Sequence, residues 1–269
     1  MENTFVFIGA GNMGGALVEA VCRAVEPKNV AIYDRDAAKL AALAEKTGCT
    51  AATDELKAVE AAHYVFLCVK PKIEKLAIAE IAPALKGEKV IVSIAAGTPI
   101  ESVKEMLAEN GVELPVVRLM PNTPVAVGKG LILMARDETV SDADVQALCA
   151  ALAPGGMVEP VSESLIDAAT PVFSCSPAYV YMFIEALADG GVMNGVPREQ
   201  AQRFAAQAVL GSAEMVLKTG KHPGELKDAV CSPGGSTIVG VETLERGGFR
   251  GSVASAVYNA YVKTVQLGK

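Results

Sequence analysis

The segment Phe5-Val-Phe-Ile-Gly-Ala-Gly-Asn-Met-Gly14 decides the fold of the first part of this 269-residue chain. Its apolar start predicts a buried strand, and the spacing of apolar residues over residues 13–25 predicts an amphipathic helix after the glycines. A strand, a glycine-rich turn and a helix in this order are typical of a dinucleotide-binding unit. A glycine-rich turn without a ligand is the alternative interpretation.

Each glycine of this segment has its own expected task. Gly9 allows a tight turn, Gly11 allows the backbone to approach a pyrophosphate, and Gly14 allows the helix to pack closely on the strand. The first N–H groups of the following helix have no partner within that helix. They offer hydrogen bonds and a partial positive charge to the phosphates.

Asp34 and Arg35 follow the second predicted strand and point to different cofactors. An acid at this distance from the glycines bonds the adenosine ribose hydroxyls, which favours NAD(H). An arginine at the same place binds a 2′-phosphate, which favours NADP(H). The two residues can also be a solvated turn. We expect NADP(H), with NAD(H) as the open alternative.

Strands and helices alternate over the first 160 residues, which predicts an α/β fold with a parallel sheet and right-handed crossovers. Ligands of such sheets bind beyond the carboxyl ends of the strands. Small residues after one strand leave room for a flat nicotinamide ring, and two prolines stiffen the loop around Asn122. The predicted strands are residues 4–8, 30–33, 64–69, 90–94, 116–119 and 131–135.

Beyond about residue 160 strand-like runs disappear and helical patterns follow one another between glycines and prolines. We therefore predict a dinucleotide-binding domain over residues 1–160 and an all-helical domain over residues 161–269. The expected helices are residues 177–189, 198–219, 223–230, 236–246 and 248–267.

The segment Cys231-Ser-Pro-Gly-Gly-Ser-Thr237 precedes one of these helices. Exposed amides and hydroxyls at a helix start can hold a small carboxylate. Ordinary capping by Ser or Thr is the alternative, but two glycines after a proline exceed what a cap needs.

Composition excludes several other functions. A net charge of −7 argues against a general nucleic-acid binder. Six dispersed cysteines without a Cys-x-x-Cys pair, together with only two histidines, argue against a zinc site, and we expect no metal. No signal peptide or membrane-spanning segment is expected, which favours a cytoplasmic protein. His63 and His222 are expected to be structural, so the chemistry is assigned to a bound cofactor.

Several motifs resemble the pyrroline-5-carboxylate reductase family over nearly the whole chain. The most specific is Leu226-Lys-Asp-Ala-Val-Cys-Ser-Pro-Gly-Gly-Ser-Thr-Ile238. The others are Phe7-Ile-Gly-Ala-Gly-Asn-Met-Gly-Gly15, Val69-Lys-Pro71, Ser93-Ile-Ala-Ala-Gly97, Met120-Pro-Asn-Thr-Pro124 and Glu185-Ala-Leu-Ala-Asp-Gly-Gly191.

The resemblance implies a Rossmann-type domain followed by a helical dimerisation domain, in a homodimer or a ring of dimers. It implies the last step of proline biosynthesis, in which NAD(P)H reduces L-1-pyrroline-5-carboxylate to L-proline. It places the substrate carboxylate at Ser232, Gly235, Ser236 and Thr237, with Thr237 as the catalytic candidate. The implied cofactor residues are Gly9, Gly11, Asn12, Met13, Gly14, Val69, Lys70, Pro71, Ala95, Ala96 and Asn122.

One segment departs from the family pattern. The family has a Gly-Ser-Gly-Pro-Ala-Tyr run where this chain reads Ser174-Cys-Ser-Pro-Ala-Tyr179. A serine in place of either glycine is costly if the backbone there has a positive φ.

Two other functions remain as alternatives. A 3-hydroxyacid dehydrogenase of the same broad architecture needs a catalytic lysine early in the second domain, and no lysine lies between Lys129 and Lys218. A non-catalytic dinucleotide-sensing protein explains the glycine loop but leaves residues 231–237 without a role.

Overall fold

The computed structural model describes residues 4–267, which divide into two compact units. Unit 1 contains the chain up to Cys175 together with the segment from Ala260 onward, and unit 2 contains Ser176–Asn259. The predicted domain boundary at residues 160 and 161 lies at the end of the last strand, whereas the compact units divide after the next helix. That boundary stays a prediction about domain organisation.

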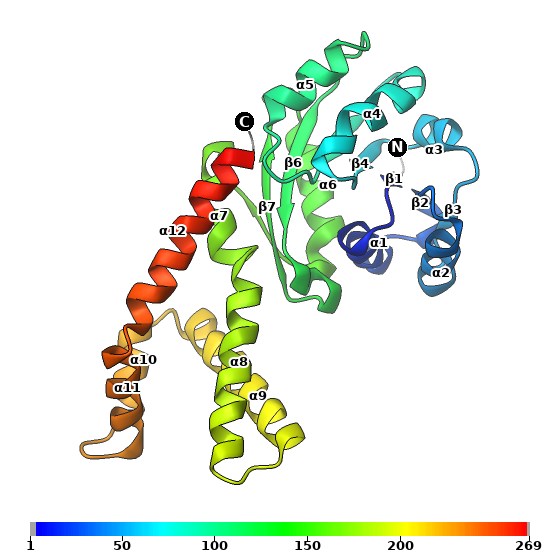
Figure 1. The fold of residues 1–269 in the computed structure, drawn as a ribbon. Helices are drawn as coiled ribbons and strands as arrows, with labels where there is room; N and C mark the ends of the chain where they lie inside the picture. Colours follow the sequence, from blue (N-terminus) through cyan, green and yellow to red (C-terminus); the bar gives the residue numbers. More distant parts are fainter. Residues whose placement is uncertain (1–3, 268–269) are drawn as a thin grey trace. The chain divides into compact units, whose positions relative to one another are not determined.

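Within residues 4–267, eight strands form one sheet in the order β3-β2-β1-β4-β5-β6-β7-β8 (Figure 1). The first six strands in the chain are parallel to one another, which confirms the predicted α/β fold. The strands are β1 (Phe5–Ile8), β2 (Val30–Tyr33), β3 (Thr50–Ala51), β4 (Tyr64–Leu67), β5 (Val90–Ser93), β6 (Val116–Pro121), β7 (Gly130–Arg136) and β8 (Gly156–Pro160).

Strand β7 runs antiparallel to β6, and β8 runs parallel to β7. The expectation of a parallel sheet was therefore wrong at this edge. Only the short segment of residues 122–129 joins β6 to β7. A parallel pair needs a crossover of a dozen or more residues, so this connection can only join antiparallel neighbours.

Helices cover both faces of the sheet because alternate strand residues point to opposite sides. Phe5, Phe7 and Phe66 face one side and Val6 and Ile8 the other, and all five are buried. The first face packs against α1 (Asn12–Ala24), α2 (Ala37–Thr47) and α6 (Asp142–Leu152). The second packs against α3 (Glu55–Ala61), α4 (Pro71–Ile81), α5 (Ile100–Ala108) and α7 (Glu163–Phe173).

Unit 2 is helical, as the sequence predicts. The helices are α8 (Ser176–Met193), α9 (Arg198–Thr219), α10 (Pro223–Ala229), α11 (Ser236–Arg246) and the first part of α12 (Phe249–Leu267). Helices α8 and α9 pack against each other through a small cluster of buried alanines, Ala188, Ala201 and Ala205. Within the described residues, none of the helices has the length and apolar character needed to cross a membrane.

Candidate nucleotide site and carboxylate loop

The predicted cofactor loops meet at one edge of the sheet because four parallel strands end in register. Ile8 of β1 pairs with Tyr33 of β2 and with Leu67 of β4, and Leu67 pairs in turn with Ser93 of β5. The glycine loop, the loop after β4 and the loop after β5 are thus neighbours at the carboxyl ends of the strands. This is where open α/β sheets bind their ligands.

Gly9 and Gly14 are required by close contacts within the protein. Gly9 has a φ of 108°, and a Cβ added to it would lie 2.7 Å from the carbonyl oxygen of Cys68. A Cβ on Gly14 would lie 2.3 Å from the carbonyl oxygen of Gly9. Gly9 therefore makes the tight turn, and Gly14 lets α1 approach that turn closely.

Gly11 is different because no atom lies within 4 Å of a Cβ added there. It is the N-cap of α1 and has no side chain to bond the first amides of the helix, which include those of Asn12 and Met13. The open space at Gly11 and the uncapped helix start fit a pyrophosphate group. A cofactor role for Gly11, Asn12 and Met13 stays a prediction, supported by this geometry.

Asp34 and Arg35 do not form a simple solvated turn. Both carboxylate oxygens of Asp34 accept backbone N–H groups, from Ala10 at 2.7 Å and from Asp36 at 2.8 Å. The guanidinium of Arg35 binds Glu80 of α4, at 2.7 Å and 2.8 Å to the two carboxylate oxygens. Asp34 therefore holds the glycine loop, and Arg35 has a carboxylate partner with which a 2′-phosphate would compete.

The loops after β4 and β5 differ in what they expose. Lys70 is the exposed N-cap of α4, and Pro71 is the first residue of that helix. Val69 packs against the core, Ala95 is buried and Ala96 is exposed. Small and exposed residues at this edge leave space for a flat ring, and the cofactor roles of these residues stay predictions.

Asn122 is a buried residue whose side chain already has partners in the protein. Its amide nitrogen donates to the carbonyl of Phe173 at 2.9 Å, and its amide oxygen accepts from the N–H of Leu131 at 2.9 Å. The side chain thus ties α7 and β7 to the end of β6. Its predicted contact with a cofactor would have to use other atoms of the residue.

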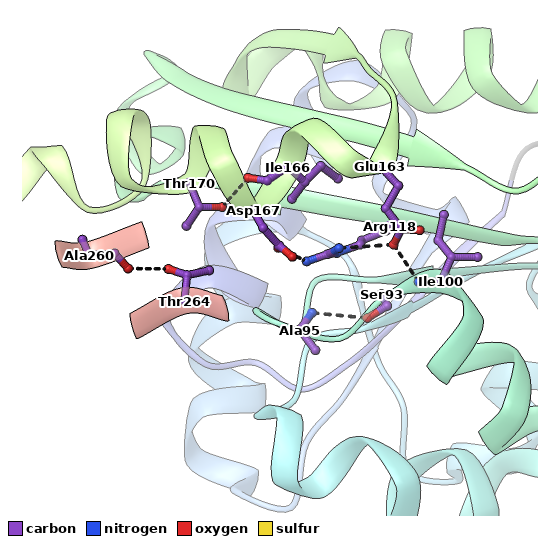
Figure 2. A network of polar contacts seen from close by, with 10 residues as sticks. All are labelled: Ser93, Ala95, Ile100, Arg118, Glu163, Ile166, Asp167, Thr170, Ala260 and Thr264. Carbon is purple, nitrogen blue, oxygen red and sulfur yellow. Dashed lines mark hydrogen bonds and ion pairs between the residues drawn. The ribbon is translucent and has the colours of Figure 1, made fainter. Parts of the chain in front are cut away.

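A charged network that sequence reasoning missed lies behind these loops (Figure 2). The buried Arg118 of β6 donates to Glu163 at 3.2 Å and to Asp167 at 2.7 Å, one turn apart on α7. Glu163 also accepts the N–H of Ile100, the first residue of α5, at 2.7 Å. An arginine inside a predicted buried strand was the signal for this network, because such a charge requires partners.

The segment 231–237 has the form expected of an anion site. Gly235 is the N-cap of α11, no side chain caps the helix, and Ser236 and Thr237 are its first two residues. Capping by Ser or Thr, the alternative interpretation, is therefore not realised. Gly234 has a φ of 68°, and a Cβ on Gly235 would lie 2.4 Å from the hydroxyl oxygen of Ser232.

The hydroxyl of Thr237 is available to a ligand. Within residues 4–267 it has no hydrogen-bond partner, and the residue is exposed. The uncapped amides and this hydroxyl can together receive a carboxylate and a neighbouring polar atom. The substrate roles of Ser232, Gly235, Ser236 and Thr237 stay predictions.

The serines that replace family glycines are not strained. Ser174 has a φ of −91° as the C-cap of α7, and Ser176 begins α8. Among the described residues, every positive φ belongs to a glycine. The departure at residues 174–176 therefore carries no backbone penalty.

Both histidines have structural partners, as predicted. The ring nitrogens of His63 lie 2.8 Å from the carbonyl oxygen of Glu88 and 2.9 Å from a carboxylate oxygen of Asp144. His222 caps α10 by accepting the N–H of Gly224 at 3.0 Å. No group of three or more His, Cys, Asp or Glu side chains within residues 4–267 is arranged to hold a metal ion.

Comparison with known proteins identifies relatives over the full chain. Residues 163–267 match the family described as pyrroline-5-carboxylate reductase dimerisation, and residues 4–97 match the family described as NADP oxidoreductase, coenzyme F420-dependent. The pyrroline-5-carboxylate reductase of Escherichia coli is 40% identical over 271 residues, covering 100% of both chains.

Two solved structures have the same architecture. The Plasmodium falciparum pyrroline carboxylate reductase, solved with NADP bound, has a TM-score of 0.88 and 32% identity, covering 100% of this chain and 99% of its own. The Coxiella burnetii pyrroline-5-carboxylate reductase has a TM-score of 0.91 and 29% identity, covering 100% of both chains. The resemblance drawn from the motifs is thereby confirmed, and this chain belongs to the pyrroline-5-carboxylate reductase family.

Proposed function

We propose that this chain reduces L-1-pyrroline-5-carboxylate to L-proline with NADPH, the last step of proline biosynthesis. The observation that carries the proposal is the uncapped start of α11, where Gly235, Ser236 and Thr237 present amides and hydroxyls to a small anion. The full-length identity to the Escherichia coli reductase supports the same substrate. The family's members are NAD(P)H-dependent oxidoreductases that act on an imine, so the predicted reaction class agrees with the relatives.

The glycine loop fits the cofactor. Gly11 leaves open space beside the uncapped start of α1, where the pyrophosphate would lie. Arg35 is the candidate for the 2′-phosphate of NADPH, and the NADP-bound structure from Plasmodium falciparum supports this choice over NADH. The residues proposed to hold the rest of the cofactor are Asn12, Met13, Gly14, Val69, Lys70, Pro71, Ala95, Ala96 and Asn122.

The substrate is held by its carboxylate. The first amides of α11 donate to that group, and the hydroxyls of Ser232 and Ser236 add further hydrogen bonds. A carboxylate fixed at one end orients the five-membered ring, which lowers the entropic part of the barrier. Thr237 would then hydrogen-bond the ring nitrogen.

Little acid–base chemistry is required of the protein. The cofactor supplies a hydride to the imine carbon when it is bound. A protonated imine accepts a hydride more readily than a neutral one, so the task of Thr237 is to stabilise the proton on the ring nitrogen. This agrees with the structural roles of His63 and His222.

Self-association is supported by the dimerisation family that matches residues 163–267. The exposed large apolar side chains of unit 2 agree with it, since apolar side chains gathered on a surface mark an interaction site. We propose that the chain forms a homodimer, or a ring of such dimers, and that it is located in the cytoplasm. Light scattering measures the mass of the assembly. The exposed residues include Tyr181, Met182 and Met193 of α8, Phe204 and Leu217 of α9, and Val239 of α11.

The test is the oxidation of NADPH and NADH, followed by absorbance, with and without pyrroline-5-carboxylate. We expect oxidation that depends on the substrate, faster with NADPH, and formation of proline. No substrate-dependent oxidation with either cofactor would contradict the proposed function and favour a dinucleotide-sensing protein.

A further inference from the structure

Glu74 is a carboxyl on the buried, otherwise apolar face of α4, where this helix meets the sheet. Its neighbours Lys72 and Lys75 on α4 are exposed, whereas Glu74 has a relative exposure of 0%. Burial of an ionised carboxyl is costly, so such a group is kept only where other groups compensate. Burial raises the pKa of Glu74, and the hydroxyls of Ser93 and Thr98 and the charge of Arg118 partly offset that rise.

The contacts of Glu74 lead directly into the loop after β5. One carboxyl oxygen accepts a hydrogen bond of 2.5 Å from the hydroxyl of Ser93, the last residue of β5. The same hydroxyl oxygen accepts the backbone N–H of Ala95 at 3.2 Å, a bond that Figure 2 shows. A carboxyl, a hydroxyl and a backbone amide thus form a chain that ends inside the Ser93–Gly97 loop.

Glu74 also acts electrostatically on the loop after β4. Burial and, to a smaller extent, the charge of Glu74 raise the pKa of Cys68, the residue that follows β4. The charge of Arg118 on β6 lowers the pKa of Glu74, and Arg118 is itself held by Glu163 and Asp167. The other carboxyl oxygen of Glu74 has no hydrogen-bond partner among the described residues.

We propose that Glu74 is a positioning residue for the nicotinamide: by holding the hydroxyl of Ser93 it sets the backbone at Ala95 and Ala96. The inference rests on the proposed function, which assigns this loop to the nicotinamide ring. Glu74 lies on the face of α4 that packs against the sheet, with a relative exposure of 0%, so its proposed effect on the cofactor passes through Ser93 and needs no direct contact. Its effect is on how tightly and in which orientation the ring is held.

Two variants separate positioning from simple packing. Glu74→Gln keeps an acceptor for Ser93 and nearly the same shape, whereas Glu74→Leu removes the acceptor. Ile81→Val, at the last buried residue of α4, is the matched control because it loses core contacts and leaves the Ser93 bond intact. The readouts are the Kd of NADPH by fluorescence titration, and KM and kcat for both substrates.

We expect Glu74→Leu to raise the Kd and KM of NADPH about three- to tenfold and to lower kcat, with the KM of pyrroline-5-carboxylate unchanged. The Kd and KM of NADPH for Glu74→Gln should stay within about twofold of the wild-type values. Ile81→Val should lower the melting temperature without changing the Kd of NADPH. If Glu74→Leu does not fold, Ser93→Ala breaks the same bond from its other end and should give the same increase.

An unchanged NADPH Kd in folded Glu74→Leu or Ser93→Ala overturns the inference. A wild-type protein that binds NADPH without reducing pyrroline-5-carboxylate contradicts the proposed function alone, because the Kd comparison still decides the role of Glu74. A wild-type protein that binds neither nicotinamide cofactor overturns both.

Discussion

The carboxylate of Asp34 accepts the backbone N–H of Ala10 at 2.7 Å, which joins the end of β2 to the middle of the glycine loop. Its second oxygen accepts the N–H of Asp36 at 2.8 Å, just before α2 begins. The acid that sequence reasoning assigned to the adenosine ribose thus has a task inside the protein. It fixes the conformation of the turn that is proposed to bind the pyrophosphate.

Replacing Asp34 by Asn should therefore weaken both the fold and the cofactor site. One acceptor becomes an NH2 group facing a backbone N–H, so we expect the free energy of unfolding to fall by about 1–3 kcal/mol. Urea unfolding measures the stability, and fluorescence titration measures the Kd of NADPH. Asp36→Asn is the control, since it removes the same charge and Asn still caps α2. Equal stability of the two variants would contradict a clamping role.

The Arg35–Glu80 pair should tune the choice of cofactor. Both side chains are largely exposed, at 68% and 39%, so the pair adds about 0–1 kcal/mol to stability and can be broken at little cost. Arg35→Ala should lower the ratio of kcat/KM for NADPH over NADH by about tenfold or more, through loss of a charge-assisted contact with the 2′-phosphate.

Glu80→Gln should change the same ratio in the opposite direction, because it releases Arg35 from its carboxylate partner. An NADPH preference that is unaffected by Arg35→Ala would show that another group binds the 2′-phosphate. The ratio of kcat/KM for NADPH over NADH is measured for each variant at the same ionic strength, since salt screens exposed charges.

Gly11→Ala and Gly14→Ala should fail in different ways. A methyl group on Gly14 meets the carbonyl oxygen of Gly9 at 2.3 Å and must distort the turn, so we expect a lower melting temperature. A methyl group on Gly11 meets nothing within 4 Å and should leave the melting temperature nearly unchanged while it weakens NADPH binding. Normal NADPH affinity in Gly11→Ala would argue against a pyrophosphate at this position.

Thr237→Ala should slow the enzyme without abolishing turnover. Loss of a hydrogen bond to the imine nitrogen is expected to lower kcat about tenfold, whereas Thr237→Ser, which keeps the hydroxyl, should retain most activity. Thr243→Ala is the matched control on the same helix, since its hydroxyl only bonds the carbonyl of Val239. Complete loss of turnover in a folded variant would give Thr237 a more central role, and wild-type turnover would remove it from the mechanism.

The buried carboxyl of Glu74 should make stability fall as pH rises. Its folded-state pKa lies above the ordinary value of 4.5, so the folded protein binds this proton more tightly than the unfolded chain. The stabilising contribution is complete below about pH 4.5 and is lost as pH rises through the folded-state pKa. The melting temperature of wild type should therefore fall relative to that of Glu74→Gln as pH rises, because Gln carries no titrating proton. Melting temperatures of the two proteins that change in parallel with pH would contradict this prediction.

Local patterns were sufficient for most of the secondary structure. Helices α9 and α11 occupy the residues that the sequence predicts, because their apolar spacing and flanking Gly and Pro define both ends. Helix α7 was missed, since Pro171 interrupts its helical pattern. Strand β8 was missed as well, because Gly156 and Pro160 at its ends are not typical of strands.

By itself, the sequence determined the turn at Gly9, the position of α11 and the family, because each depends on neighbouring residues or on a contiguous motif. Only the tertiary structure decided the direction of β7, the hydrogen bond between Ala10 and Asp34, the partner of Arg35, and the buried hydrogen bond between Ser93 and Glu74. These depend on contacts between residues far apart in the chain. A charged side chain in a sequence does not reveal its partner, because folding chooses the partner from the whole chain.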